Sequence, residues 1–144
     1  MSGLGCIEWL VGMRFKSVEQ IDPGELQALL DQPGRPVLLD VREMDEFLTS
    51  HLYGAHQIDP QTPPHEVIER FGSHTSFVTY CTVGYRSSKL ATQLQEEGMC
   101  VKNLRGSIFA WANLFFPLQT ECPGRLKVHP YHPVFAPLLD RVYK

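Results

Sequence analysis

One short segment of the sequence, residues 77–88, contains the residue types of a nucleophilic site. Residues 77–80 form an apolar, aromatic and β-branched run, which is typical of a strand covered on both faces. From Ser87 onward the apolar positions recur at helical spacing, and Gly98 provides a C-terminal stop for that helix. Cys81 is therefore predicted at the carboxyl end of a buried strand, with the following backbone N–H groups leading into a helix N-terminus.

The residues that follow Cys81 suit a negatively charged sulfur. Backbone amides and the positive end of a helix dipole stabilise an anion at such a position, and a nearby arginine adds to this effect. Gly84 permits a tight loop, and Arg86 supplies a planar, always charged side chain at its end. A lone cysteine after a strand is more often a small buried apolar residue. The complete run Cys-Thr-Val-Gly-Tyr-Arg-Ser, in a strand-loop-helix context, favours a reactive thiolate instead.

The composition limits the classes of protein to consider. The 144 residues, 43% of them hydrophobic, are enough for one domain with a core. A net charge of −3 gives no support to binding of nucleic acid or of a membrane. The four cysteines include no C-x-x-C pair, so we expect reduced thiols and a cytoplasmic location. Residues 1–13 hold an apolar run too short to span a bilayer, and we expect a poorly ordered N-terminal extension there.

The rest of the chain alternates short apolar runs with helical patterns. Asp22 followed by Pro23 is a helix-start signal, with Asp22 as the predicted cap. Strands are predicted over residues 14–18, 36–41, 77–80 and 99–104 and after a bend at Gly54 within 51–58, with helical segments over 22–30, 42–48, 66–71, 87–97 and 106–114. We therefore predict an α/β domain over residues 14–118, in which a mainly parallel sheet of about five short strands has helices on both faces. Ligands of such sheets lie at the carboxyl ends of the strands.

A charged segment, residues 40–46, is predicted to follow the central strand at that same edge of the sheet. Four carboxylates of this segment lie close to Arg42 in the sequence: Asp40, Glu43, Asp45 and Glu46. They could form a general acid–base pair, but an ion-pair network with charge at a helix N-terminus explains them more simply. We predict that Arg86 pairs with one of these carboxylates and positions the loop, rather than binding substrate directly.

The C-terminal segment, residues 119–144, is rich in proline and is predicted to pack on the domain through Tyr131, Phe135 and Leu138. Three of its residues are metal ligands by type: Cys122, His129 and His132. They lack the paired spacing of zinc sites, so no metal site is predicted. The remaining histidines are expected to be structural or exposed: His51, His56, His65 and His74.

Four stretches of the sequence, taken in order, form a recognisable pattern. They are LLDVRE at residues 38–43 with EF at 46–47, HLYGA at 51–55, YCTVGYRS at 80–87 and LRGSIFAW at 104–111. In this order they resemble the single-domain form of the rhodanese-like sulfurtransferase family, and the resemblance extends over about residues 17–118. The first and third stretches together are the most specific.

The resemblance implies covalent sulfur transfer without a metal or an organic cofactor. It makes Cys81 the nucleophile that carries the sulfur, with its persulfide surrounded by the amides of the loop residues Thr82, Val83, Gly84, Tyr85 and Arg86. Supporting roles fall to Asp40, Arg42, Glu46 and Ser87. The implied donor is a small sulfur-containing anion such as thiosulfate or a protein persulfide, and the acceptor is a thiol or cyanide. A monomer is favoured.

Two departures from the family pattern bear on the substrate. Ser107 stands where the family more often has a second glycine, which would place a side chain near the pocket rim. Thr82, Val83 and Tyr85 are neutral, whereas thiosulfate-using members often carry basic residues inside the loop. Thiosulfate is therefore expected to be a poor donor.

Two other functions compete with sulfur transfer. A phosphatase or arsenate reductase also places a cysteine and an arginine around an anion, but the six residues from Cys81 to Arg86 are one fewer than in the loops of those relatives. The space enclosed by this shorter loop should fit a sulfur atom and be too small for a tetrahedral phosphoryl group. The second alternative is a rhodanese-like binding or sulfur-carrier module without turnover. Retention of Cys81, Gly84 and Arg86 speaks against an inert module.

Overall fold

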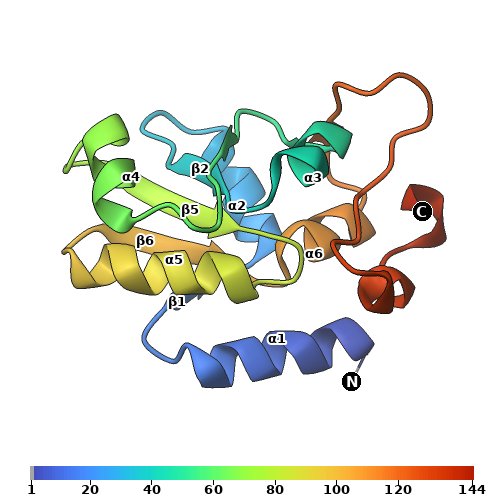
Figure 1. Cartoon of the computed structure of the whole chain (residues 1–144), viewed down its shortest axis with the longest axis horizontal. Helices are drawn as coiled ribbons and strands as arrows, with labels where there is room; N and C mark the ends of the chain where they lie inside the picture. The colour runs from blue at the N-terminus through green and yellow to red at the C-terminus, as the bar shows by residue number, and fades with distance from the viewer. Residues whose placement is uncertain (1) are drawn as a thin grey trace.

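A computed structural model describes residues 2–144, in which five parallel strands form a central sheet (Figure 1). Across the sheet the strands lie in the order β1 (Glu19–Ile21), β6 (Cys100–Leu104), β5 (Ser76–Tyr80), β2 (Val37–Asp40) and β4 (His56–Gln57). All four neighbouring pairs are parallel. This is the α/β architecture that the sequence predicts, with β5 at its centre.

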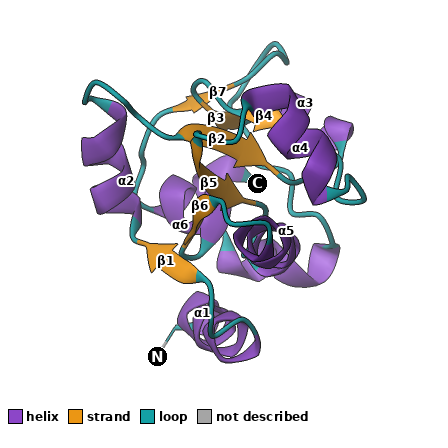
Figure 2. Ribbon diagram, turned by 90° about the vertical axis from the view of Figure 1, so that its left-hand side faces the viewer, coloured by secondary structure: helices purple, strands orange, loops and turns teal. Residues whose placement is uncertain are grey.

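Helices cover both faces of this sheet (Figure 2). The helices α2 (Pro23–Leu30) and α6 (Ser107–Asn113) lie on one side, and α4 (Pro64–Phe71) and α5 (Tyr85–Glu96) lie on the other. The remaining elements are α1 (Gly3–Arg14), α3 (Met44–Thr49), an antiparallel pair of β3 (His51–Leu52) and β7 (Leu118–Gln119), and 3-10 helices at Pro133–Leu138 and Arg141–Tyr143. Within residues 2–144, no helix is long and apolar enough to cross a bilayer.

Alternation of side chains along the strands produces two cores. Leu38 and Val78 point to the face covered by α2 and α6, whereas their neighbours Leu39 and Phe77 point to the face covered by α4 and α5. All four side chains are at most 2% exposed. Full burial of a side chain of this size stabilises the fold by about 1.5–3 kcal/mol. A shift of the pairing by one residue would move each of these side chains to the other face, so their burial fixes the strand register.

The carboxyl ends of the parallel strands meet at one edge of the sheet. Asp40 ends β2 and is paired in register with Tyr80, which ends β5. In Figure 1 the arrows of β5 and β6 point toward α6 and the C-terminal segment, and the N-terminus of α1 lies at the same end of the molecule. The loops that follow Asp40, Tyr80 and Leu104 are therefore brought together there.

The first 21 residues differ from the sequence expectations. A helix, α1, occupies residues 3–14 in place of a poorly ordered extension over 1–13; Met1 lies outside the described residues. The helix is apolar on most of its circumference, so it has no amphipathic period, yet Val11 is buried against the domain. The first strand is Glu19–Ile21 rather than residues 14–18, because β6 offers pairing partners at residues 102–104. Asp22 makes no side-chain cap and pairs with Arg105 instead, at 3.3 Å.

The C-terminal segment contributes side chains to the core beside α2 and α6. Val128, Leu139 and Tyr143 are buried there, whereas Tyr131 is 51% exposed. Asn113 of α6 anchors the segment, because its side chain donates to the Leu138 carbonyl and accepts from the Asp140 N–H. The domain limits at residues 14 and 118 stay a prediction.

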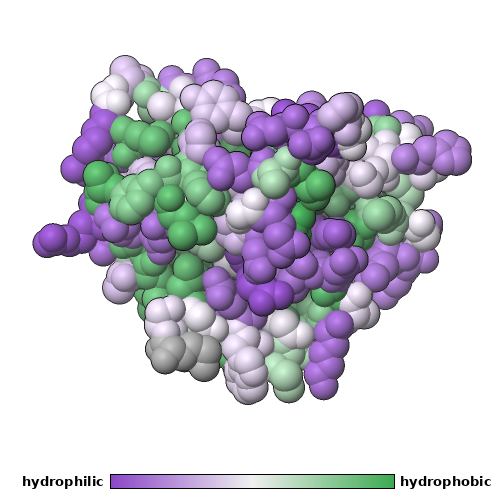
Figure 3. All heavy atoms as spheres, turned by 180° about the vertical axis from the view of Figure 1, so that it is seen from behind, coloured by the Kyte–Doolittle hydropathy of each residue, from purple (hydrophilic) through white to green (hydrophobic). Residues whose placement is uncertain are grey.

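Apolar side chains also reach the surface at this end of the molecule. Figure 3 shows them gathered on the side where α6 and the C-terminal segment lie, while hydrophilic side chains predominate in the middle of that face. Leu114 and Phe115, just after α6, are 53% and 63% exposed.

The hydroxyl of Tyr80 provides a test of the packing between β5 and β3. It accepts the N–H of Leu52 at 3.0 Å, and both residues are fully buried. Tyr80→Phe leaves this N–H without a partner, so we expect the free energy of unfolding to fall by about 1–3 kcal/mol in urea denaturation. Tyr53→Phe, at a position that is 56% exposed, is the matched control and should change it by less than about 0.5 kcal/mol. An equal loss in both variants would contradict this role of the Tyr80 hydroxyl.

Candidate active site

The thiol of Cys81 lies directly after β5, where the loop turns into α5. The residue is only 2% exposed. Its Sγ accepts the N–H of Gly84 at 3.2 Å and lies 3.4 Å from the hydroxyl of Ser87. The N–H groups in the first turn of α5 have no acceptor within the helix, so the sulfur sits beside a set of donors that favour negative charge.

Gly84 allows this arrangement through its backbone conformation. Its φ is 121°, which side chains rarely adopt, and its carbonyl begins the hydrogen bonding of α5 by accepting the N–H of Ser88. The Cβ of any other residue would also lie 3.5 Å from Val11 of α1 and 3.5 Å from Asn103 of β6. The loop at this point is thus packed between two elements that are distant in sequence.

The end of the loop is held by a paired charge. Arg86 binds the carboxylate of Glu46 with two hydrogen bonds, of 2.8 and 2.9 Å, as predicted for a carboxylate of residues 40–46. The Thr82 hydroxyl accepts from Arg86 at 2.8 Å and donates to Glu46 at 3.2 Å. The side chains of Arg86 and Glu46 are 14% and 2% exposed. Loop, α5 and α3 are therefore joined by one nearly buried cluster.

The pKa values of this pair reflect their mutual stabilisation. Burial alone would raise the pKa of Glu46, but the hydrogen bonds and charge of Arg86, with the Glu43 N–H and the charge of Arg42, lower it. Burial alone would lower the pKa of Arg86, but the hydrogen bonds to Glu46 together with the nearby acidic groups of Cys81, Glu46 and Tyr131 outweigh it and raise that pKa. Both groups are therefore held in their charged forms.

The N-terminus of α6 holds the loop from the other side. Cys81 donates its N–H to the Ser107 hydroxyl at 3.1 Å, and its carbonyl accepts the N–H of Ile108. The Thr82 carbonyl accepts the N–H of Phe109 in the same way. Ser107 is fully buried below the loop, so its predicted position at the pocket rim is wrong. Its hydroxyl orients the cysteine backbone instead of restricting access.

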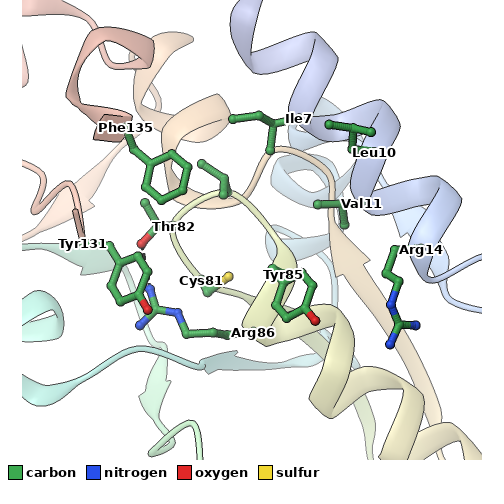
Figure 4. Close-up of a pocket in the computed structure, with 11 residues that line it drawn as sticks. Ile7, Leu10, Val11, Arg14, Cys81, Thr82, Tyr85, Arg86, Tyr131 and Phe135 are labelled. Carbon is green, nitrogen blue, oxygen red and sulfur yellow. Dashed lines mark hydrogen bonds between the residues drawn. The ribbon is translucent and has the colours of Figure 1, made fainter. Parts of the chain in front are cut away.

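A cavity of about 530 Å³ opens in front of the sulfur (Figure 4). The figure shows Cys81 at its floor, α1 along one wall and the C-terminal segment on the opposite side. Its lining residues are Ile7, Leu10, Val11, Arg14, Cys81, Thr82, Val83, Tyr85, Arg86, Tyr131 and Phe135. Three segments of the chain therefore form the cavity: the loop, the N-terminal helix and the C-terminal segment.

The family follows from the sequence match. The model of the rhodanese-like domain matches residues 22–114, which include the Cys81 loop and its supports on α3 and α6. The chain belongs to the rhodanese-like family.

Sulfurtransferases are among the relatives of this rhodanese-like chain. It is 30% identical over 142 residues to the adenylyltransferase and sulfurtransferase uba4 of Pyricularia oryzae, covering 76% of the chain and 28% of that protein. It is 31% identical over 100 residues to the probable adenylyltransferase/sulfurtransferase MoeZ of Mycobacterium tuberculosis, covering 67% and 25%. The chain thus spans about a quarter of the length of these relatives.

Solved structures share the rhodanese-like fold. The thiosulfate sulfurtransferase of Pseudomonas aeruginosa matches with a TM-score of 0.70 and 24% identity, over 83% of this chain and 23% of the other. A rhodanese-like domain protein from Staphylococcus aureus matches with a TM-score of 0.64 and 24% identity, over 73% of this chain and 100% of the other.

Other residues singled out in the sequence lie outside the cavity. Asp40 and Arg42 form a fully buried pair at 2.7 Å, and Arg42 also donates to the Ser50 carbonyl, so they join the end of β2 to the end of α3. Ser87 is buried below the loop, 2.6 Å from Asn103. His129 lies 3.5 Å from Asp45. Over the described residues no group of three potential metal ligands gathers.

Sequence reasoning missed the cavity walls. Ile7, Leu10 and Val11 belong to an apolar run that the sequence makes visible, but its position above the loop depends on tertiary packing. Tyr131 packs on the domain as expected, but sequence reasoning did not foresee that its ring lies 3.9 Å from the Arg86 guanidinium beside the loop. The apolar residues in the two terminal segments were the available signal, and they carry no period that places them over the loop.

The lowered pKa of Glu46 predicts a particular acid sensitivity. The unfolded chain binds this proton near the ordinary pKa of about 4.3, and the folded chain binds it only at lower pH. The stabilisation by Glu46 is therefore complete above that pH and is lost as the pH falls through the folded pKa. In thermal melts from pH 7 to pH 3, Glu46→Gln should start from a lower melting temperature and lose less of it on acidification than the parent.

The matched control is Glu69→Gln, because Glu69 is an exposed carboxylate on α4. The melting temperature of this variant should fall with pH in the same way as that of the parent. Parallel profiles for the parent and Glu46→Gln would show that the Glu46 carboxylate contributes nothing to acid sensitivity.

Proposed function

We propose that this rhodanese-like domain is a sulfurtransferase that carries a sulfane sulfur on Cys81. The observation that supports it most is the position of Sγ at the cavity floor, 3.2 Å from the Gly84 N–H and beside the first turn of α5. A persulfide formed there adds one sulfur atom and keeps a negative charge, which these donors stabilise. Neither step of the transfer requires a general base once the thiol is ionised.

The reaction consists of two displacements at sulfur. The Cys81 thiolate attacks the outer sulfur of the donor, a sulfur–sulfur bond forms, and the remainder of the donor leaves with the electron pair of the bond that breaks. A thiolate or cyanide then attacks the terminal sulfur, and Cys81 leaves as the thiolate. With cyanide the product is thiocyanate. Charge and sulfur balance in each step, and no external oxidant is consumed.

In this proposal Arg86 is a positioning residue. Both terminal nitrogens of its guanidinium donate to Glu46, and one of them also donates to the Thr82 hydroxyl. A side chain bound in this way cannot turn toward a substrate without breaking a nearly buried ion pair, which costs roughly 3–5 kcal/mol when burial is deep. The six-residue loop that it closes is also tighter than a tetrahedral phosphoryl group would require, which disfavours the phosphatase alternative.

The named relatives support a protein, as well as a small molecule, as the donor or acceptor of sulfur. Both curated relatives are named adenylyltransferase and sulfurtransferase, and the chain matches about a quarter of their length. A domain of this type can take sulfur from a small anion or a protein persulfide and pass it to a thiol, including one on a carrier protein. Because the four cysteines of the sequence include no C-x-x-C pair, we propose a reducing compartment such as the cytoplasm.

Replacement of Cys81 by serine tests the proposal. Serine is close in size but forms no persulfide, so Cys81→Ser should fold normally and lose sulfur transfer from thiosulfate to cyanide completely. Mass spectrometry after incubation with donor should find one added sulfur atom on the parent, located on the Cys81 peptide, and none on the variant.

The control variant is Cys100→Ser, because Cys100 is an exposed thiol on β6. It should retain the activity and the adduct. Transfer by Cys81→Ser at the parental rate, or an adduct on another cysteine alone, would overturn the assignment.

A further inference from the structure

The C-terminal segment reaches the active site although it lies beyond the part of the chain that matches the family. The family match ends at residue 114, yet Tyr131 and Phe135 of this segment line the cavity in front of Cys81. Figure 4 shows the ring of Tyr131 beside the side chain of Arg86. The centre of that ring lies 3.9 Å from the guanidinium carbon. The contact therefore joins the end of the loop to a segment outside the family match.

Burial does not explain where the ring of Tyr131 lies, because the residue is 51% exposed. Its position is specified by local structure instead. The backbone of Tyr131 has a φ of 67°, in the left-handed region that residues with a side chain rarely adopt. Its N–H is donated to Nδ1 of His129 at 2.9 Å, and its ring stacks on that of Phe135 with centroids 6.3 Å apart. A strained backbone persists only where its surroundings hold it, and such strain is concentrated at functional sites.

Tyr131 occupies the part of Arg86 that the other contacts leave open. Glu46 and the Thr82 hydroxyl accept N–H groups, which lie at the edge of the planar guanidinium. The ring of Tyr131 lies over its face. Attraction between the cation and the ring holds the side chain in place, and removal of that face from water strengthens the ion pair. Arg86 is therefore held by three segments: α3, the loop and the C-terminal segment.

We infer that Tyr131 is a positioning residue for the sulfur transfer: its ring holds Arg86 against Glu46, and the paired Arg86 holds the loop that presents Cys81. The inference rests on the proposed sulfur transfer and assigns part of its active site to the C-terminal segment. Tyr131 acts only through Arg86 and takes no part in the bonds that form or break at sulfur. The matched domain, residues 22–114, would by itself lack this support of the loop.

Two substitutions of Tyr131 separate the attraction between ring and cation from simple packing. Tyr131→Leu keeps an apolar side chain but removes the aromatic face, whereas Tyr131→Phe keeps that face and removes only the hydroxyl. Uptake of sulfur by Cys81 from thiosulfate is followed by mass spectrometry in a single turnover, so that slow variants remain measurable. We expect Tyr131→Leu to lower the rate constant about fivefold, within the range that a cation–π contact implies, and Tyr131→Phe to stay within about twofold of the parent.

The matched control is Tyr53→Leu, because Tyr53 is similarly exposed, at 56%, and does not line the cavity. This variant should keep the parental rate constant. Thermal melts establish that each variant is folded.

A second measurement shows whether Tyr131 acts through Arg86. In the Arg86→Gln background the cation is absent, so Tyr131→Leu should lower the rate constant no further. A second loss of about fivefold in that background would mean that Tyr131 acts on the donor or on the fold directly, and the inference would be wrong.

The outcomes separate this inference from the proposed function. If the parent takes up no sulfur on Cys81, sulfur transfer is wrong, and the role of Tyr131 falls with it. If the parent takes up sulfur and Tyr131→Leu matches it, or Tyr131→Phe loses as much as Tyr131→Leu, the inference is overturned while sulfur transfer stands. A loss that Tyr131→Phe avoids, and that disappears in the Arg86→Gln background, supports both.

Discussion

The ion pair between Glu46 and Arg86 determines the shape of the loop that presents Cys81. Glu46 belongs to α3, where its carboxylate also accepts the Glu43 N–H and so fixes the first turn of that helix. Arg86 belongs to the first turn of α5. Because the pair is nearly buried and bidentate, it holds the two helix N-termini in one orientation at the edge of the sheet. The loop between Cys81 and Arg86 has to close within that frame.

The sheet explains why these groups can meet at all. Parallel pairing brings the ends of β2, β5 and β6 to the same edge, so that α3, α5 and α6 all begin there. Gly84, the residue before α5, directs its N–H toward the sulfur, and the first turn of α6 directs N–H groups toward the carbonyls of Cys81 and Thr82. Burial of the apolar faces of these helices thus fixes a polar arrangement that local sequence alone would not maintain.

The sequence predicted what is local and missed what depends on distant packing. The strand at residues 77–80 and the helix after it follow from short patterns. The pairing of Arg86 with a carboxylate of residues 40–46 follows from the predicted parallel sheet, which brings two strand ends to one edge. The choice of Glu46 among four carboxylates depends on the orientation of α3, which no short pattern encodes. The structure of residues 3–14 was missed because an apolar helix without a polar face has no helical period. The orientation of Ser107 depends on a positive φ of 51° that its residue type does not suggest.

A double-mutant cycle on Glu46 and Arg86 tests the central claim most directly. The quantity to measure is the rate constant for uptake of sulfur by Cys81 from thiosulfate, in the parent, Glu46→Gln, Arg86→Gln and the double variant. If the pair acts as one unit that shapes the loop, the double variant loses no more than either single variant, with a coupling energy of about 1–3 kcal/mol. If the two losses add, each residue acts independently, and the claim that their ion pair holds the site is contradicted.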